Sequence, residues 1–348
     1  MKRIGIICPS EIAFRRFLPA LKEAGCFECA GVAIASKEEF VGATDEILAK
    51  EKAKAQSFVD NNGGRIYEGY DTLIQSNDVD AIYLPLPPGL HYKWAKRALA
   101  AGKHILVEKP CTTALETTED LLKEADEKRL AVHENYMFAF HNQLKAIDTV
   151  IKSGEIGDVH LYRISFGFPM RAQNDFRYNS ALGGGALLDC GGYTLKYASL
   201  LLGSTSQIRY AQSNYVEGFN VDMYGSAALV NDEGITAQVA FGMDYYYKCE
   251  LEVWGSKGTF YTNRVLTAPA GYVPEAIIRK GNEEEKRSLP SDDAFKKSIL
   301  HFCRCIEEPA VREDNYQLLL RQAKLVESFK QMAGLNTKNN SNIIELLI

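Results

Sequence analysis

The sequence His104-Ile105-Leu106-Val107-Glu108-Lys109-Pro110 is a short apolar run that leads directly into two charged residues and a proline. Runs of this kind form buried strands of parallel sheets. Four similar runs precede it, at residues 2–8, 29–35, 65–67 and 79–84, and helical patterns lie among them at 11–24, 52–61 and 91–101. Strands that alternate with helices in this way predict a parallel, doubly wound sheet. The first part of the chain is therefore predicted to be an α/β domain.

After residue 110 the pattern continues with one more helix and then changes. Thr113 and Glu116 have the spacing of a capping box, which predicts the start of that helix. Beyond residue 133 come an aromatic segment at 134–141, a helix around 142–152, strands at 157–168, 208–219, 226–230, 236–241, 250–254 and 259–262, and closing helices at 294–306 and 315–333. We therefore predict a nucleotide-binding domain over 1–133 and, over 134–348, an α+β domain with an open, mostly antiparallel sheet.

The composition is that of an ordinary globular protein. The 348 residues suffice for two domains, and 46% of them are hydrophobic and 24% charged. The net charge of −5 gives no electrostatic footprint for nucleic acid or for an anionic membrane. No apolar run approaches the roughly 20 residues that span a bilayer, and the first residues lack a signal-peptide pattern. We expect a cytoplasmic protein that binds neither nucleic acid nor membrane.

The eight cysteines are scattered along the chain. Two close pairs, Cys26 with Cys29 and Cys303 with Cys305, lack a second pair at the spacing of a zinc site. A redox motif at Cys26 is one interpretation, and buried thiols in a reducing compartment are the commoner one. No metal site is predicted.

Residues 182–193 read Leu-Gly-Gly-Gly-Ala-Leu-Leu-Asp-Cys-Gly-Gly-Tyr and open an apolar run with helical spacing. On such a helix Asp189 and Tyr193 are four residues apart and share one face. Gly191 and Gly192 lie between them, and each mid-helix glycine costs roughly 1 kcal/mol relative to alanine. The helix either makes room for a ligand beside these two polar groups, or it is loosely packed, with Asp189 exposed and the Tyr193 ring in the core.

A doubly wound sheet binds ligands beyond the carboxyl ends of its strands, where the first turn usually carries Gly-x-Gly-x-x-Gly/Ala. Here that turn reads Cys8-Pro9-Ser10-Glu11-Ile12-Ala13, and only the final small residue matches. Such a turn before a helix can still present N–H groups to a pyrophosphate. After the second strand, Ala35-Ser36-Lys37 offers a hydroxyl and a cation, which suit a 2′-phosphate and favour NADP. An ordinary polar strand end, with Glu38 and Glu39 close by, is the alternative.

Four separated stretches follow one pattern, in order and in spacing: Glu108-Lys109-Pro110, Phe176-Arg177-Tyr178, residues 183–193 and Trp254-Gly255-Ser256-Lys257-Gly258. They resemble the glucose–fructose oxidoreductase / inositol dehydrogenase / rhizopine-catabolism (Gfo/Idh/MocA) family, and the resemblance covers nearly the whole chain. It implies an N-terminal Rossmann domain and a C-terminal α/β domain with an open sheet. It also implies NAD(P)-linked redox chemistry on sugars, cyclitols or related alcohols.

The resemblance implies a catalytic set of Lys109, Asp189 and Tyr193. Lys109 would contact the substrate oxygen and the nicotinamide region, Asp189 would bind a neighbouring hydroxyl, and Tyr193 is similar to the tyrosine of one branch of the family. Substrate contacts are expected from these three residues and from Arg177 and Tyr178. Cofactor contacts are expected from Cys8, Ser10, Ile12, Ala13, Ser36, Lys37, Leu86, Pro87, His91, Glu108, Lys109 and Pro110. His141 is a further candidate, with a structural histidine as the alternative.

Elementary chemistry supports the pairing of a lysine with a tyrosine. Hydride transfer between carbon and nicotinamide requires a proton to join or leave the oxygen on the same carbon. A free tyrosine, with a pKa of about 10, is a poor base at neutral pH. A nearby ammonium such as that of Lys109 favours the phenolate of Tyr193. Because the two residues fall in different predicted domains, the site requires both domains.

The sequence thus predicts an NAD(P)-dependent oxidoreductase acting on a sugar or nucleotide sugar, with NADP as the cofactor and NAD possible. Arg171 and Arg177 could meet a diphosphate. The aromatic segment 243–247 favours a homo-oligomer, dimer or tetramer, with a covered sheet face as the alternative. Because the glycine loop is eroded, a non-catalytic sensor or scaffold that kept the fold is a second hypothesis. A tightly held cofactor recycled between two sugars is a third.

Overall fold

The computed structural model describes residues 1–40 and 43–335 of the chain. They form two compact units, one of Met1–Asn135 with Phe295–Leu320 and the other of Tyr136–Ala294 with the residues from Arg321 on. The first unit breaks off after Asn135, close to the boundary predicted after residue 133. The assignment of the two predicted domains to cofactor and substrate stays a prediction. Within the described residues, no helix is both long and apolar enough to cross a membrane.

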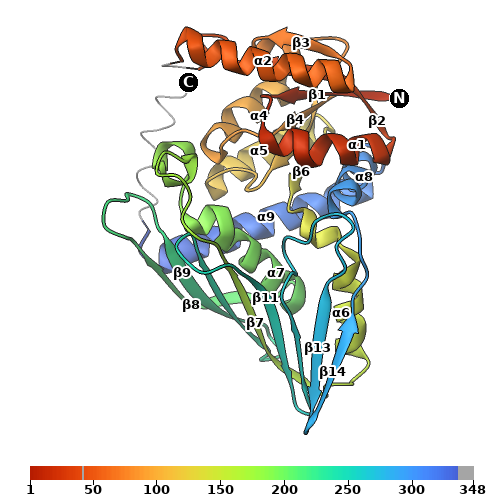
Figure 1. Cartoon of the computed structure of the whole chain (residues 1–348), viewed down its shortest axis with the longest axis vertical. Helices are drawn as coiled ribbons and strands as arrows, with labels where there is room; N and C mark the ends of the chain where they lie inside the picture. Colours follow the sequence, from red (N-terminus) through yellow and green to blue (C-terminus); the bar gives the residue numbers. More distant parts are fainter. Residues whose placement is uncertain (41–42, 336–348) are drawn as a thin grey trace. The chain divides into compact units, whose positions relative to one another are not determined.

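The first unit is built on a six-stranded parallel sheet with the strand order β3-β2-β1-β4-β5-β6 (Figure 1). The strands are β1 (Lys2–Ile7), β2 (Phe27–Ile34), β3 (Arg65–Glu68), β4 (Ala81–Leu84), β5 (His104–Glu108) and β6 (Val132–Asn135). This confirms the predicted doubly wound sheet. The order reverses between β1 and β4, so the carboxyl ends of these two strands form the switch point where such sheets bind ligands.

Helices and helical turns connect the strands: η1 (Ala13–Phe17), α1 (Leu18–Ala24), α2 (Asp45–Asn62), α3 (Tyr70–Ile74), η2 (Pro88–Leu90), α4 (His91–Ala100) and α5 (Leu115–Glu127). The ring of Phe17 stacks on that of Tyr83 with centroids 3.9 Å apart, which joins η1 to β4 in the core. The capping box expected at Thr113 is wrong, because α5 begins at Leu115 with Ala114 at the N-cap. Instead, the hydroxyls of Thr112, Thr117 and Thr118 bond to the Ala114 carbonyl.

The chain returns to the first unit near its end, through α8 (Ala294–Glu307) and the first part of α9 (Pro309–Met332). Sequence reasoning did not assign these helices to the unit, and it did not identify β6 as a strand. The reason lies in the polar side chains of β6. The His133 ring nitrogens lie 2.9 Å from Asn315 Oδ1 and 2.9 Å from Ser298 Oγ. Ser298 in turn donates to Asn135 Oδ1 at 2.8 Å. Because hydrogen bonds satisfy these polar groups, β6 can be buried without apolar side chains. Its sequence therefore shows no apolar run.

The second unit is built on an eight-stranded sheet with the order β14-β13-β12-β11-β7-β10-β9-β8 (Figure 1). Its strands are β7 (Val159–Gly167), β8 (Gln207–Asn214), β9 (Tyr224–Val230), β10 (Thr236–Gly242), β11 (Lys248–Gly255), β12 (Thr259–Thr262), β13 (Glu275–Lys280) and β14 (Glu283–Ser288). Only the β7–β10 pair is parallel among the described ladders of this sheet, which confirms the predicted, mostly antiparallel arrangement.

Helical segments of this unit are η3 (Met137–Phe140), α6 (Asn142–Lys152), η4 (Phe176–Tyr178), η5 (Ser180–Leu182), η6 (Leu187–Gly191) and α7 (Gly192–Leu202). η6 and α7 are consecutive and form one helical segment, which is called the site helix below. It packs on β7 and β10. The strands contribute Phe241, Leu251 and Tyr162, among others, to the core of this unit.

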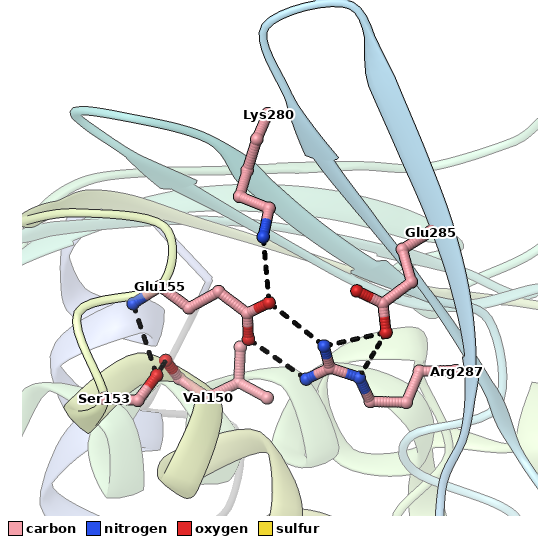
Figure 2. Close-up of polar contacts among 6 residues, drawn as sticks. All are labelled: Val150, Ser153, Glu155, Lys280, Glu285 and Arg287. Atoms are coloured by element: carbon pink, nitrogen blue, oxygen red, sulfur yellow. Dashed lines mark hydrogen bonds and ion pairs between the residues drawn. The ribbon is translucent and has the colours of Figure 1, made fainter.

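The hairpin of β13 and β14 was not predicted, because β14 reads Glu-Glu-Glu-Lys-Arg-Ser and offers no apolar pattern. Figure 2 shows what holds it to the turn after α6. The Glu155 carboxylate lies 3.1 Å from Lys280 Nζ and accepts two hydrogen bonds of 3.0 Å from the Arg287 guanidinium. These cations lower the pKa of Glu155. Charges of this kind also keep an exposed edge strand from pairing with another chain.

Candidate functional site

The carboxyl-terminal edge of the parallel sheet gathers the residues predicted to contact a cofactor. Cys8, Ser10, Ile12 and Ala13 follow β1; Ser36 and Lys37 follow β2; Leu86, Pro87 and His91 follow β4; Glu108 ends β5, and Lys109 and Pro110 come directly after it. Because all of these strands are parallel, their carboxyl ends lie on one edge. The fold therefore brings together, within one unit, residues that are up to a hundred positions apart in the sequence.

Cys8 occupies a backbone conformation that normally requires glycine. Its φ is 77°, in the left-handed region, where a side chain costs roughly 1–2 kcal/mol. This position follows β1, where the dinucleotide fingerprint has its first glycine. Burial raises the pKa of the Cys8 thiol to about 12, so the thiol is protonated and unreactive at neutral pH. The turn therefore keeps a glycine-type conformation without the glycine.

The helical segment after this turn begins at the switch point. Ser10 Oγ accepts from the Ala13 amide at 3.3 Å and Ser10 N donates to the Cys8 carbonyl at 2.9 Å. Glu11 and Ile12 lie in the first helical turn, whose amides have no preceding turn to accept from them. This set of N–H donors and a serine hydroxyl fits an anionic group such as a pyrophosphate.

The residues that follow β2 indicate whether the site suits the ribose diol of NAD or the 2′-phosphate of NADP. Glu39 accepts three backbone N–H groups, from Ser36 at 2.9 Å, Tyr70 at 2.8 Å and Asp71 at 2.9 Å. Its carboxylate therefore fixes the turn to the start of α3 and is already engaged where an NAD site needs an acidic acceptor. Lys37 is exposed and pairs with Asp45 at 2.6 Å, and an exposed pair of this kind is worth little. The donors at this turn fit a phosphate better than a diol.

Beneath Lys109, the carboxylate of Glu108 is buried and hydrogen-bonded. Its Oε1 accepts from Tyr83 Oη and from Asn135 Nδ2, each at 2.7 Å. Burial raises the pKa of Glu108, and these two donors oppose the shift. The peptide bond between Lys109 and Pro110 is cis. Side-chain bonds to the two neighbouring strands, β4 and β6, thus fix the residue before Lys109.

His91 joins two of the loops at this edge. It is fully buried, and its ring nitrogens lie 2.8 Å from the Pro110 carbonyl oxygen and 2.7 Å from that of Leu86. Burial lowers the pKa of the imidazole to about 4, so the ring is neutral at physiological pH. A neutral ring has one N–H, so His91 donates to one of these carbonyl oxygens, while its other nitrogen lies against the second, between the loop after β4 and the loop after β5.

The site helix carries Asp189 and Tyr193 in the second unit. Its first part, η6, is π-helical, a form that is frequent at functional sites. Asp189 Oδ2 accepts from Arg177 Nε at 2.7 Å, and Arg177 Nη1 also lies 3.1 Å from Asp175 Oδ1. Two carboxylates therefore already engage the Arg177 guanidinium, and the structure pairs two of the predicted substrate residues with each other.

Tyr193 is held by aromatic rings. Its side chain is 9% exposed. Its ring lies edge-on to Tyr136 and Phe166, with centroids 5.0 Å and 5.3 Å away, and is tilted against Phe138 at 5.7 Å. Such contacts fix the direction of the phenol ring while burying most of its apolar surface.

The glycines between Asp189 and Tyr193 make room for the protein itself. A Cβ at Gly191 would lie 2.9 Å from the Phe241 ring, and one at Gly192 would lie 2.1 Å from Tyr136 Oη. Gln322 Nε2 also donates to the Gly192 carbonyl at 2.9 Å. At these two positions the predicted room for a ligand is wrong, because protein atoms fill it. The helix is not loosely packed either, but the Tyr193 ring does lie in the core, as the alternative predicts.

An open cavity of about 520 Å³ lies beside the predicted substrate residues of this unit. Gln173, Tyr178, Gly218, Phe219 and Asn220 line it. The rings of Tyr178 and Phe219 are 4.9 Å apart, and Tyr178 Oη accepts from the Arg171 amide at 2.8 Å. Sequence reasoning predicts pocket residues at Tyr178 and near 168–175, a segment that includes Gln173, but it does not predict the lining by residues 218–220. Within the described residues, no group of three or more histidine, cysteine or acidic side chains could hold a metal ion.

Both units match sequence models of one family. A model described as "Oxidoreductase family, NAD-binding Rossmann fold" matches residues 3–136, and one described as "GFO/IDH/MocA C-terminal domain" matches residues 144–261. The chain is 37% identical to dTDP-3,4-didehydro-2,6-dideoxy-alpha-D-glucose 3-reductase of Actinomadura kijaniata, over 94% of each chain. It is also 37% identical to the protein of the same name from Streptomyces violaceoruber, over 96% of each.

Solved structures agree with this relationship. KijD10, a 3-ketoreductase from Actinomadura kijaniata crystallised with NADP and TDP-benzene, superposes with a TM-score of 0.87 at 36% identity, over 95% of this chain and 97% of that one. An aldose-aldose oxidoreductase from Caulobacter crescentus superposes with a TM-score of 0.80 over 96% and 97% of the two chains. Its identity is 22%, so this second likeness shows the fold alone.

Replacing Gly192 by alanine is expected to lower the free energy of unfolding by about 1–3 kcal/mol, the usual cost of overpacking. The added methyl group would collide with Tyr136 Oη. Chemical denaturation of Gly192→Ala measures the loss. The double variant Tyr136→Phe/Gly192→Ala removes the colliding hydroxyl and should recover part of it. A stability equal to that of the wild type in Gly192→Ala would contradict the packing described for the site helix.

Cys8→Gly is expected to be more stable than Cys8→Ala by about 1 kcal/mol, because only glycine adopts a φ of 77° without strain. At an ordinary position the order is reversed, since glycine has the larger unfolded-state entropy. Thermal or chemical denaturation of the two variants gives the sign directly. Alanine more stable than glycine would show that the turn is not strained.

Proposed function

The chain belongs to the GFO/IDH/MocA family of oxidoreductases, and we propose that it is an NADPH-dependent ketoreductase of nucleotide-linked sugars. The observation that carries the proposal is the match, over nearly the whole length, to relatives named as dTDP-sugar 3-reductases. The sugar is a small molecule with a carbonyl group, and the reaction converts that carbonyl and NADPH with a proton into an alcohol and NADP⁺.

Two observations support NADP as the cofactor. In the turn after β2, three backbone amides occupy the carboxylate of Glu39. Ser36 and Lys37 then remain as groups able to meet a 2′-phosphate. The relative KijD10 has been solved with NADP. NAD, which lacks that phosphate, is expected to bind less tightly.

We assign the proton-transfer step to Tyr193 and Lys109. The Tyr193 hydroxyl would give its proton to the substrate oxygen as hydride reaches the carbon, and the Lys109 ammonium would favour the phenolate left behind. Structures of KijD10 variants include one with a tyrosine changed to phenylalanine and one with a lysine changed to alanine. The spacing between those two positions equals the spacing between Lys109 and Tyr193, which supports the assignment. Asp189 would orient the sugar through a neighbouring hydroxyl.

Arg171 is the better candidate for the diphosphate of a nucleotide sugar. Arg177 is committed to Asp189 and Asp175. The Arg171 guanidinium lies 5.3 Å from the centroid of the Phe168 ring and is exposed. An exposed guanidinium with its fork of donors suits phosphate oxygens. We therefore propose that Arg177 orders Asp189 and that Arg171 meets the phosphates.

We also propose that the chain works as a homo-oligomer in the cytoplasm. Large aromatic side chains of the second unit are exposed: Tyr246, in the bend between β10 and β11, is 89% exposed, Tyr210 of β8 is 53% exposed and Trp254 of β11 is 42% exposed. Exposed aromatic side chains are enriched at interfaces. All eight cysteines are free thiols, a state that a reducing compartment maintains.

Tyr193→Phe is expected to lower kcat with a dTDP-linked keto sugar by at least about 100-fold, the usual contribution of a positioned acid. NADPH affinity should be unchanged, because the predicted cofactor residues belong to the other unit. The assay follows NADPH oxidation. Tyr197→Phe is the matched control, since it removes a buried hydroxyl one turn further along the same helix. Full activity in Tyr193→Phe would refute its role.

Lys37→Ala is expected to reduce the NADPH-over-NADH preference in kcat/KM by about tenfold, the equivalent of one ion pair worth about 1.4 kcal/mol. The loss should appear with NADPH and leave the values for NADH nearly unchanged. Lys50→Ala, another exposed and paired lysine, serves as the control. A wild type that prefers NADH would exclude the 2′-phosphate assignment.

The oligomer is tested by light scattering of the purified protein, with a dimer or tetramer as the expected mass. Tyr246→Glu places a charge on the most exposed of these aromatic residues and should shift the mass toward the monomer. A wild type that is monomeric at micromolar concentration would contradict the proposal.

A further inference from the structure

Asp222 is a buried carboxylate outside the predicted site. Its side chain is 8% exposed, and it lies in the loop between β8 and β9. Its Oδ2 accepts from the Leu187 amide at 2.7 Å, and its own carbonyl oxygen accepts from the Ala186 amide at 2.7 Å. Ala186 is the N-cap residue of the site helix and Leu187 is its first residue. Asp222 therefore caps a helix that is remote from it in sequence.

The contact links Asp222 to the residues that hold Asp189. Gly185 has a φ of 117°, and a Cβ there would lie 2.2 Å from Asp222 Oδ1, so the carboxylate packs directly on the turn. The Gly185 amide donates to the Arg177 carbonyl at 2.9 Å, and the Gly185 carbonyl accepts from the Asp189 amide at 3.1 Å. A shift of this turn would move Arg177 and Asp189 together.

The charge of Asp222 suits its place. A helix N-terminus carries a partial positive charge, and a carboxylate there is stabilising. At the other end of the site helix, the guanidinium of Arg321 donates to the carbonyls of Ser199 and Gly203 and lies 3.3 Å from Ser206 Oγ. The helix that carries Asp189 and Tyr193 is thus held at each end by a charge of the sign that its dipole favours.

Resting on the proposed reductase function, we propose that Asp222 is a positioning residue, whose carboxylate holds the turn at 185–187 so that Asp189 and Tyr193 keep their orientation. It acts through the amide of Leu187 and the backbone of Gly185, and not by contact with substrate or cofactor. The charged form holds the turn, because the carboxylate anion is the stronger hydrogen-bond acceptor. Its negative charge also interacts favourably with the partial positive charge at the N-terminus of the helix.

Because Asp222 can be protonated, its hold on the turn at 185–187 depends on pH. The groups that face it are the Leu187 amide, the Ser213 hydroxyl of β8, and, through charge, Lys330 of α9 and Tyr215 of the adjoining loop. Burial raises the pKa of Asp222 to about 6, against the opposing effects of the amide and of Lys330. As the pH falls through about 6, the carboxylate takes up a proton and the turn loses its charged cap.

Protonation of Asp222 weakens the positioning of the turn but favours the folded state over the unfolded state. An aspartate in the unfolded chain titrates near 3.9, so the folded state binds the proton more tightly than the unfolded state does. By linkage, the contribution of Asp222 to stability falls as the pH rises from about 4 to about 6, over the range in which the positioning improves. A residue that merely stabilised the fold would make activity and stability change together.

The test compares the wild type with Asp222→Asn, which keeps an acceptor for the Leu187 amide and removes the charge. We expect kcat at pH 8 to fall by about tenfold, the difference between a charged and a neutral hydrogen bond, with the KM for NADPH unchanged. The acid limb of kcat near pH 6 should disappear, and the melting temperature at pH 8 should not fall. Asp232→Asn, an exposed aspartate of the same unit, is the control.

Asp222→Ala removes the acceptor as well and should lose more activity than Asp222→Asn. If the alanine variant does not fold, the asparagine variant still decides the question. An asparagine variant with the kcat and pH profile of the wild type would overturn the proposal. So would a variant that loses activity only in proportion to its folded fraction.

Hydrogen exchange of the segment 185–193 separates this proposal from the proposed function. If the wild type reduces no nucleotide-linked keto sugar, the reductase assignment fails and exchange alone decides the role of Asp222. Exchange corrected for the intrinsic rate should then be faster in Asp222→Asn than in the wild type, and faster in the wild type below pH 6 than above it. Equal exchange in both proteins and at both pH values would overturn the role of Asp222.

Discussion

The helix that bears Asp189 and Tyr193 depends on close packing along its length and on charge at its ends. Phe241 and Tyr136 lie so near its two central glycines that no other residue type fits at either position without displacing a neighbour. Asp222 binds the amides at its start, and Arg321 binds the carbonyls at its end. Buried polar groups are costly unless all are satisfied, so these partners fix the rotation of the helix as well as its position. The direction in which Asp189 and Tyr193 point follows from that rotation.

In the first unit, the loops at the carboxyl-terminal edge of the sheet are held in a different way. Its strands are short and parallel, so their carboxyl ends coincide, and hydrogen-bonded side chains beneath the edge hold the loops in place. Glu108 is bonded to Tyr83 and Asn135, and His91 joins the loop after β4 to the loop after β5. These residues supply no reacting atom in the proposed mechanism. They order the backbone from which Lys109 projects, which is how preorganised sites are generally built.

The sequence predicts the parallel sheet, the mostly antiparallel sheet and the family, because strand–helix alternation and spaced motifs are local patterns. It does not predict β6 or β14, because their polar and charged side chains are satisfied by partners distant in the sequence, such as Asn315 for His133 and Glu155 for Arg287. The same limit applies to Asp222, since an aspartate in a loop between strands has no local signal that it caps a remote helix. The role of Cys8 is visible only in its φ angle. Residues whose function depends on a long-range contact are those that sequence reasoning misses.

We infer that a turn without the usual glycines still forms a working cofactor site. Titration of the purified protein with NADPH and with NADH, followed by nicotinamide fluorescence or by calorimetry, tests it most directly. We expect saturable binding of NADPH at micromolar concentration and weaker binding of NADH, because the turn keeps its glycine-type conformation and Ser36 and Lys37 suit a 2′-phosphate. Absence of binding to either nucleotide would show that this turn does not hold the cofactor and would favour a protein that has kept the fold without turnover.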